Sequence, residues 1–495
     1  MKTERNSGIL LHPTSLPGKY GIGSLGTEAF RFIDFLASAG QKLWQILPLG
    51  PTGYGDSPYQ CFSSVAGNPL LINLELLVEK GLLNADELNN APVFSDIEID
   101  YATVIQYKYE KLETAFINFG TKANQELKKD FADFCNQNAH WLNDYALFMA
   151  LKGHHRQVSW YDWKQEYRQR NPQALITFSE KYEQQIGLMK FMQYLFFRQW
   201  ADVKKYANDR EIKIIGDIPI YISADSVETW TKPEIFLFDE NKKPTLVAGV
   251  PPDYFSETGQ LWGNPIYNWD YHKQSNFAWW KERIKANLEL FDIVRIDHFR
   301  GFSEFWAVPV GQETAINGEW LPCPGYELFA SLKEEFGELP IIAEDLGVIT
   351  DDVVAMRENF GFPGMKILQF AFDSDEDNDY LPHTYEKNFV VYTGTHDNDT
   401  IASWYNLAND KNKKSVHDYL GNNVENGAWD FIKLAHSSVA NVSIIPLQDL
   451  LNLGNEARMN MPGTTEGNWK WRFGKDDISS GLAKRLAAIT KIYGR

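Results

Sequence analysis

Eight short apolar runs rich in β-branched residues recur along the chain, and most lack the strict apolar–polar alternation of a half-exposed strand. They span residues 8–13, 42–51, 212–219, 291–297, 340–347, 365–372, 389–397 and 442–450. Continuous apolar character is typical of strands buried on both faces of a parallel sheet. Amphipathic helical patterns follow several runs, as in 27–40, where Thr27 is a candidate N-cap and Gly40 a candidate end. The pattern predicts an α/β fold, either a (β/α)8 TIM barrel or a doubly wound open sheet.

The predicted strands are unevenly spaced. A βαβ unit needs about 30 residues, and several gaps are much longer. We expect one barrel over residues 1–495 with inserted subdomains at about 75–190, which is mainly helical, 220–290, which carries loops, and 302–325. No Ser/Gly linker, low-complexity tract or internal repeat marks a boundary between separate domains.

Composition narrows the functional classes. The chain has 495 residues, 44% of them apolar, and a formal net charge of −18. Excess carboxylate repels phosphate backbones and anionic lipid, and no apolar run is long enough to span a bilayer. Cys61, Cys135 and Cys323 are odd in number and far apart, and the first residues do not follow a secretory signal pattern. We expect a cytoplasmic protein that binds neither nucleic acid nor membrane; its oligomeric state stays open.

The run at 291–302, "FDIVRIDHFRGF", ends in charged residues. Arg295 and Asp297 are two apart, so they share a strand face, and active groups of parallel barrels lie at the carboxyl ends of the strands. A neighbouring guanidinium favours an ionised carboxylate, so we expect Arg295 to lower the pKa of Asp297 by about 1–3 units. His298 would lie on the other face or at the turn. A structural ion pair explains this motif equally well.

Two further strands end in acids. "IIAEDLG" ends in Glu344 and Asp345, which alternate, so that only one of them faces the barrel mouth. "YTGTHDNDT" places Asp397 at the same rim. Converging carboxylates raise each other's pKa, so one stays protonated near neutral pH while another is charged. This arrangement is typical of retaining glycoside transfer.

Metal and cofactor sites explain the same sequence less well. There is no HExxH motif and no recognisable ligand spacing, and the calcium-like stretch 373–384 has Asn378 and Thr384 where a loop of that kind needs Gly and Glu. "GIGSLG" at 21–26 matches a dinucleotide motif, but the next strand ends without the acid that binds ribose. We expect neither a cofactor nor a metal.

Long phrases along nearly the whole chain carry a resemblance. They are "GILLHPTSLPGKYGIGSLG", "PLGPTGYGDSPYQ", "IGDIPIYIS", "GVPPDYFSETGQLWGNPIYNW", "RIDHFRGF", "AEDLG", "GTHDNDT" and "NEARMNMPGT". In these phrases the sequence resembles 4-α-glucanotransferases of the amylomaltase or disproportionating-enzyme family, glycoside hydrolase family 77 of the α-amylase clan. The resemblance implies a (β/α)8 barrel with insertions and no separate C-terminal β-domain.

The resemblance also implies residue roles. Asp297 would be the nucleophile that forms a covalent glucosyl-enzyme, Glu344 the general acid and base, and Asp397 the group that holds ring hydroxyls of the reacting sugar. It is the resemblance that selects Glu344 over Asp345. Implied substrate-binding residues are Tyr54, Ser57, Tyr59, Asp217, Asp253, Trp262, Arg295, His396 and Asn460.

A transferase needs aromatic platforms for the acceptor sugar and a loop that excludes water. We expect that loop within 253–269, where Tyr254, Phe255 and Trp262 are candidates for stacking on sugars and Gly259 and Gly263 would give mobility. Ordinary packing under a loop explains these aromatic residues too, above all Phe255, as it does Tyr59 in the phrase at 53–60.

Three functions remain open. The first is disproportionation of maltooligosaccharides, amylose or glycogen-derived glucans without a cofactor. The second is α-glucan hydrolysis, and the third is glucan binding without catalysis. Intact Asp297, Glu344 and Asp397 argue against the third, because binding needs no poised acid and nucleophile.

Overall fold

The computed structural model describes residues 4–252 and 256–495, and over these ranges eight parallel strands form one sheet in the order β10-β11-β12-β1-β2-β3-β6-β9. The strands are β1 (Asn6–Leu10), β2 (Leu43–Gln45), β3 (Lys213–Pro219), β6 (Ile293–Asp297), β9 (Ile341–Ala343), β10 (Gly364–Ile367), β11 (Phe389–Tyr392) and β12 (Val442–Pro446). Each overlaps one of the eight apolar runs, so the strand predictions are confirmed.

The two outer strands in this order, β9 and β10, meet and close the sheet into a barrel. The Ala343 N–H donates to the Pro363 carbonyl at 2.9 Å, and the Met365 N–H donates to Asp345 Oδ1 at 2.7 Å. A doubly wound sheet would leave both strands as separate edges. The predicted barrel is therefore confirmed and the open sheet is wrong.

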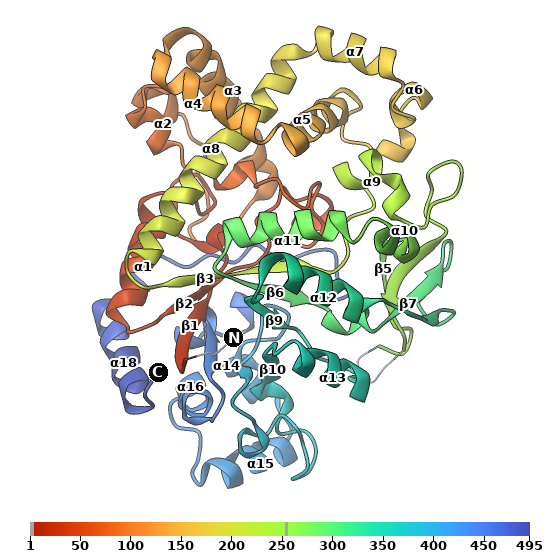
Figure 1. Ribbon diagram of the computed structural model, residues 1–495. Coiled ribbons are helices and arrows are strands. Elements are labelled where there is room, and N and C mark those ends of the chain that lie inside the picture. The colour runs from red at the N-terminus through yellow and green to blue at the C-terminus, as the bar shows by residue number, and fades with distance from the viewer. Residues whose placement is uncertain (1–3, 253–255) are drawn as a thin grey trace.

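Helices surround the barrel and build the insertions (Figure 1). They are α1 (Thr27–Ser38), α2 (Glu75–Glu79), α3 (Tyr101–Lys122), α4 (Gln125–Gln137), α5 (Ala139–His154), α6 (Gln165–Arg168), α7 (Pro172–Lys181), α8 (Glu183–Asn208), α9 (Val227–Thr231), α10 (Trp269–Gln274), α11 (Ala278–Leu290), α12 (Gly325–Phe336), α13 (Asp351–Asn359), α14 (Ile401–Leu407), α15 (Asp410–Leu420), α16 (Ala428–Ser437), α17 (Leu447–Leu450) and α18 (Ser480–Ile492). Helices α2 to α7 and the start of α8 form the upper lobe in Figure 1, all within the connection from β2 to β3. The C-terminal helix α18 packs against α1.

A second, antiparallel sheet lies beside the barrel. Its order is β5-β4-β7-β8, with β4 (Leu246–Val250), β5 (Gln260–Pro265), β7 (Glu304–Pro309) and β8 (Glu319–Pro322). The sequence pattern predicted no strands in these segments. Its central strands, β4 and β7, are far apart in the sequence, and a pattern of local periodicity does not reveal such pairing. Strands β5 and β8 add to them across short connections.

The first barrel helix begins one residue differently from the prediction. Thr27 is the first helical residue, and Gly26 is the N-cap without a side-chain hydrogen bond. An added Cβ at Gly26 would lie 2.2 Å from the Asn73 side chain, so close packing fixes a glycine where the cap would otherwise carry a side chain. Gly40 follows the helix end with φ +72°, as the sequence predicted.

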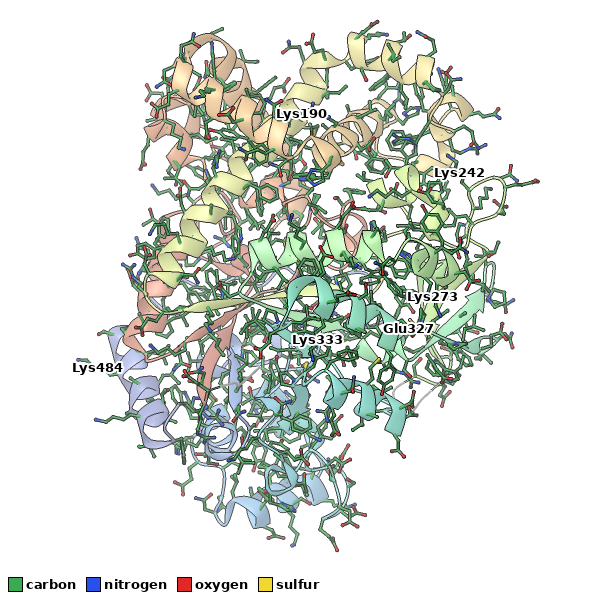
Figure 2. The ribbon with its side chains drawn as sticks, viewed as in Figure 1. Lys190, Lys242, Lys273, Glu327, Lys333 and Lys484 are labelled. Atoms are coloured by element: carbon green, nitrogen blue, oxygen red, sulfur yellow. The ribbon has the colours of Figure 1, made fainter. Side chains whose placement is uncertain are left out.

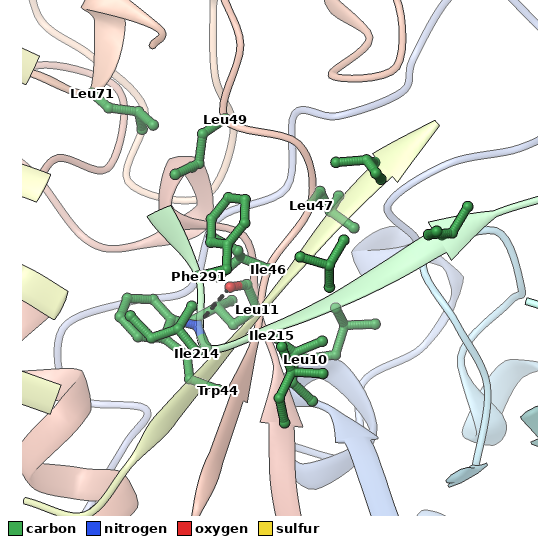
Figure 3. Packing of buried hydrophobic residues seen from close by; sticks show 14 of the residues in the cluster. Leu10, Leu11, Trp44, Ile46, Leu47, Leu49, Leu71, Ile214, Ile215 and Phe291 are labelled. Atoms are coloured by element: carbon green, nitrogen blue, oxygen red, sulfur yellow. Dashed lines mark hydrogen bonds between the residues drawn. The ribbon is translucent and has the colours of Figure 1, made fainter. Parts of the chain in front are cut away.

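The barrel core is packed on both sides of β2 (Figure 3). Trp44 is fully buried, lies edge-on against Phe32 of α1 at 5.2 Å, and donates its indole N–H to the Leu11 carbonyl at 2.8 Å. Gln45 points the other way, into the barrel, where it accepts a hydrogen bond from the Tyr392 hydroxyl of the distant strand β11 at 2.8 Å. Its register partners Leu10 and Ile215 share this face, so Gln45 is a hydrogen-bonded polar group among apolar side chains inside the barrel.

Charged side chains cover the outer surface, as the labelled residues in Figure 2 illustrate. Lys273 of α10 and Glu327 of α12 form an ion pair of 3.0 Å there. Both are about half exposed, so water and salt screen the pair and it contributes little to stability. In the described ranges, no helix combines the length and apolar character needed to cross a membrane.

Replacing Trp44 with Phe tests the outer core. The substitution leaves the buried Leu11 carbonyl without its donor, so we expect the free energy of unfolding to fall by about 1–3 kcal/mol. Urea denaturation followed by far-UV circular dichroism measures this. Trp141→Phe in α5 is the control, because its indole N–H donates to Asn138 at a partly exposed position where water can replace it. Equal losses in both variants would contradict the prediction.

Candidate active site

A cleft of about 530 Å³ opens at the carboxyl ends of the barrel strands. Segments far apart in the sequence form its walls, because connections from different strands meet at this rim. Its polar and aromatic lining residues are Ser57, Tyr59, Gln60, Tyr221, Gln260, Trp262, Asn264, Asp297, His298, His396, Asp397, Asn460, Thr464, Thr465, Asn468 and Trp469.

A chain of charged contacts lies under the cleft floor. Arg295 Nη1 donates to Asp217 Oδ2 at 2.6 Å, and its Nη2 lies 3.0 Å from Asp297 Oδ1. The Tyr59 hydroxyl donates to the same oxygen of Asp217 at 2.8 Å. Asp217 on β3 and Arg295 on β6 are register partners, so both point into the barrel. The side chain of Asp297 is 31% exposed and those of Asp217 and Arg295 are buried, so this chain presents Asp297 to the cleft.

The pKa of Asp297 is raised to about 6. Burial is the largest cause, and the charges of Asp217 and Asp397 add to it, while Arg295 and His396 act in the opposite direction. The prediction that Arg295 lowers this pKa is confirmed in direction, but burial outweighs the guanidinium, so the net shift is upward. The guanidinium offsets only part of the cost of burying the carboxylate. At neutral pH the ionised form still predominates.

Glu344 is the first residue after β9. Its Oε2 accepts the His298 N–H at 2.6 Å, and its Oε1 accepts the Leu346 N–H at 2.8 Å. Burial and the charge of Asp297 raise its pKa to about 8, although Arg295 and both hydrogen bonds lower it. Glu344 is 9% exposed, is not among the residues that line the cleft, and contacts the cleft wall through the His298 N–H; with this raised pKa it is protonated at neutral pH.

Asp345 points away from this cluster. Its carboxylate accepts the Met365 N–H at the junction of β9 and β10, and it lies 3.5 Å from Arg357 Nε. The charge of Asp297 raises the pKa of Glu344, whereas Asp345 bonds to β10. The two acids therefore differ in their surroundings, and the role of Glu344 stays a prediction.

Asp397 and Asn460 form another part of the cleft wall. Asn460 Nδ2 donates to Asp397 Oδ1 at 2.6 Å, and the Asp397 side chain is 45% exposed. Arg458 ties the two backbones together, donating to the carbonyls of Asp397 and Asn460 at 2.8 Å each. His396 stacks on Tyr59 with ring centroids 5.2 Å apart and planes 14° apart. Asp397, Asn460, His396 and Tyr59 therefore lie together at the cleft, and their binding of sugar stays a prediction.

The other predicted residues divide into two groups. Ser57 and Trp262 line the cleft, the latter from strand β5. Tyr54 begins the short helix η2 (Tyr54–Asp56), but its side chain is outside what the structure describes. Asp253 and the two aromatic residues predicted beside it fall in 253–255, outside the described residues.

His298 is a site residue whose role the sequence left undefined. Its φ of +55° places it in the left-handed region at the turn after β6. This conformation aims its N–H at Glu344, while its ring lines the cleft and meets Trp262 edge-on at 4.8 Å. Burial lowers the pKa of its imidazole to about 3, so the ring is neutral. The position of His298 next to Asp297 in the sequence indicated a site residue. The alternation of strand residues, however, does not reveal that the backbone of His298 is left-handed.

The sequence pattern did not predict Trp469 as a residue of the site. Trp469 is buried at the cleft wall, and its backbone has a φ of +64°. Its backbone N–H donates to the Met459 carbonyl at 2.7 Å, and this bond closes the base of the loop 460–468. Its ring lies 5.9 Å from that of Tyr59. The sequence feature that could have identified this residue is a tryptophan within a polar, glycine-containing stretch.

The site holds two carboxyl groups in different protonation states. Near neutral pH Asp297 is ionised and Glu344 is protonated, so one can act as a nucleophile or base while the other donates a proton. Such a pair is suited to double displacement at a sugar carbon. Among the described residues, no group of three or more His, Cys, Asp or Glu side chains is arranged to hold a metal ion.

Comparisons with known proteins agree with this geometry. The sequence profile of glycoside hydrolase family 77, described as 4-alpha-glucanotransferase, matches residues 11–476. A 4-alpha-glucanotransferase of Synechocystis sp. is 52% identical, covering 100% of this chain and 99% of the relative. One of Thermus thermophilus is 48% identical, with 100% of both chains covered.

The fold agrees as well. The structure of an amylomaltase from Streptococcus agalactiae in complex with acarbose superposes with a TM-score of 0.96 at 43% identity, covering 99% of this chain and 100% of that one. The matches in sequence and structure span the barrel and its insertions together. The chain therefore belongs to glycoside hydrolase family 77, the 4-alpha-glucanotransferase family.

Proposed function

We propose that the protein is a disproportionating 4-α-glucanotransferase, which moves a segment of a 1,4-α-D-glucan to the 4-hydroxyl of an acceptor glucose or glucan. The observation that carries the proposal is that the cleft presents Asp297, held 3.0 Å from Arg295, next to a buried acid, Glu344, whose pKa is raised by burial and by the charge of Asp297. Named relatives and an amylomaltase structure over the full chain length support the same activity. Maltooligosaccharides, amylose and glycogen-derived glucans are the substrates that we infer.

In the first step, the Asp297 carboxylate attacks the anomeric carbon of the donor sugar. The glycosidic C–O bond breaks, and Glu344 gives its proton to the departing oxygen. In the second step, Glu344 takes the proton from the acceptor 4-hydroxyl, whose oxygen attacks the same carbon and releases Asp297. Two inversions retain the α-configuration. No cofactor is needed, because the bond broken and the bond formed are of the same kind.

The neighbouring residues bind and orient the sugar. Asp397 and Asn460, joined at 2.6 Å, offer hydrogen-bonding groups for ring hydroxyls. Arg295 keeps Asp297 in place and supplies positive charge beneath it. Tyr59 and Trp262 offer aromatic faces for the flat sides of glucose rings, and Ser57 adds a hydroxyl at the cleft.

The product pattern from maltotriose tests the reaction class. Transfer yields glucose together with chains longer than three units, because a second maltotriose accepts the donor segment. Hydrolysis by the same covalent route yields shorter sugars alone, since water takes the acceptor's place. Chromatography of the products separates the two outcomes. Shortening without any longer chain would favour an α-glucan hydrolase, and no conversion would overturn both readings.

Asp297→Asn and Glu344→Gln test the assigned roles. We expect each to lower kcat by at least about 100-fold, because each removes a group that acts in the transition state. Initial rates with maltotriose measure this, and circular dichroism checks the fold. Asp377→Asn is the matched control, since Asp377 lies in an exposed acidic loop. A rate within a few-fold of wild type in either test variant would contradict the assignment.

The pH profile tests the protonation states. Activity should fall on the acid side as Asp297 takes up a proton, near its raised pKa of about 6, and on the alkaline side as Glu344 loses its proton, near about 8. The two apparent values in kcat/KM belong to the coupled pair. In Glu344→Gln, a glucosyl donor with a fluoride leaving group needs no proton in the first step, so a burst of fluoride stoichiometric with the enzyme should be recovered, and the rate of this burst should lack the alkaline limb. An alkaline limb that persists in this variant would assign it to another group.

A further inference from the structure

The junction between β9 and β10 differs from the rest of the barrel. The seven other pairs of neighbouring strands are joined by ladders of parallel register within the described ranges. At this junction the Ala343 N–H donates to the Pro363 carbonyl, and the next contact along it is made by a side chain, Asp345 Oδ1, which accepts the Met365 N–H at 2.7 Å. The Asp345 carboxylate takes the place that a backbone carbonyl has in a regular ladder.

This carboxylate is enclosed. The Asp345 side chain is 8% exposed and that of Arg357, on α13, is 6% exposed, with Nε and Oδ2 3.5 Å apart. Lys366 of β10 and Tyr380 are the further titratable groups coupled to Asp345. A Cβ added at Gly364 would lie 2.4 Å from both Asp345 Oδ2 and Arg357 Nη1. The absence of a side chain at position 364 leaves the space in which the pair sits.

The backbone at this junction carries Glu344. Glu344 lies between Ala343, which bonds to β10 through its N–H, and Asp345, which bonds to β10 through its carboxylate. The Glu344 carboxylate in turn accepts the N–H of Leu346, one residue beyond Asp345. Glu344 is also held from the side of β6, because its N–H donates to the Ile296 carbonyl at 3.1 Å and its carbonyl accepts the Phe299 N–H at 3.0 Å. A change in the backbone at 345 would therefore act on Glu344 through the Leu346 N–H and from the side that faces β10.

We propose that Asp345 is a positioning residue for the reaction, whose carboxylate completes the junction of β9 and β10 and thereby holds the proton donor Glu344 in its buried position beside Asp297. The proposal rests on the proposed function for the role of Glu344. Arg357 supplies the compensating charge for the buried carboxylate. When the junction loosens, water reaches Glu344 and its raised pKa falls toward the ordinary value.

Asp345→Ala removes the acceptor. We expect kcat for maltotriose transfer to fall about 100-fold, since a small displacement of a catalytic group has this effect, while KM changes little. The alkaline limb of the pH profile should move to lower pH, and hydrogen exchange of the Met365 amide should become faster. Asp345→Asn keeps an amide oxygen for the Met365 N–H, so we expect it to restore most of kcat and the alkaline limb.

Two further variants keep the test decisive. Gly364→Ala pushes the pair apart without removing it, so it should reproduce the kinetic changes even where Asp345→Ala does not fold. Glu358→Gln is the matched control, because Glu358 is an exposed acid that also contacts Arg357, at 3.4 Å. It should leave kcat, the pH profile and Met365 exchange unchanged.

Some outcomes overturn the proposal. A folded Asp345→Ala enzyme with wild-type kcat refutes it. A folded Asp345→Ala enzyme with a lower kcat but an unchanged alkaline limb of the pH profile refutes it too, because that result indicates a purely structural role. If Asp345→Ala does not fold, Gly364→Ala with wild-type kcat and alkaline limb refutes it as well. A wild-type protein that makes no longer chains from maltotriose would refute the proposed function instead. In that case Met365 exchange still reports whether Asp345 holds the junction.

Discussion

The site depends on one buried cation placed between two acids. Arg295 is almost fully enclosed, and removing a guanidinium from water costs several kcal/mol unless partners compensate. Asp217 provides this compensation from the neighbouring strand β3 and Asp297 from the same strand, β6, and Asp217 also accepts the Tyr59 hydroxyl. Because Asp217 fixes one end of the guanidinium, the other end fixes Asp297. The position of the candidate nucleophile is thus set by the strand register.

The same burial acts on two carboxyl groups with different results. Desolvation raises the pKa of Asp297 and of Glu344. Asp297 is in direct contact with Arg295, which offsets part of the shift, while Glu344 meets the charge of Asp297 and shifts further. One group is therefore ionised and the other protonated near pH 7. Uniform burial without the guanidinium would hold both groups closer to the neutral state, and the difference needed for acid and nucleophile would shrink.

The strands of the barrel hold the charged residues of the site, and the connections between the strands form the walls of the cleft. Trp262 comes from the edge of the antiparallel sheet, Tyr59 from the loop after β2, and Asn460 and Trp469 from the stretch after β12. Arg458 bonds the last of these segments to the backbone of Asp397. Connections of such different lengths can meet because they all leave the same end of one closed sheet.

The sequence by itself determined the eight strands and the rim to which their charged ends belong, because burial on both faces leaves continuous apolar runs and parallel strands end on one side. Together with the resemblance it also indicated which residues to examine there. It did not predict the antiparallel sheet, whose central strands β4 and β7 pair over a long separation, or the glycine cap of α1, which is fixed by contact with Asn73.

Only the tertiary structure decided the electrostatics and the choice between adjacent acids. A short-range pattern placed Arg295 beside Asp297 and predicted that the guanidinium lowers its pKa, but it contained no measure of burial, which makes the net shift upward. It left Glu344 and Asp345 equivalent, whereas the closure of the barrel turns one toward Asp297 and uses the other to join β9 to β10. Desolvation and closure both depend on the whole set of surrounding segments, and no single stretch of sequence encodes them.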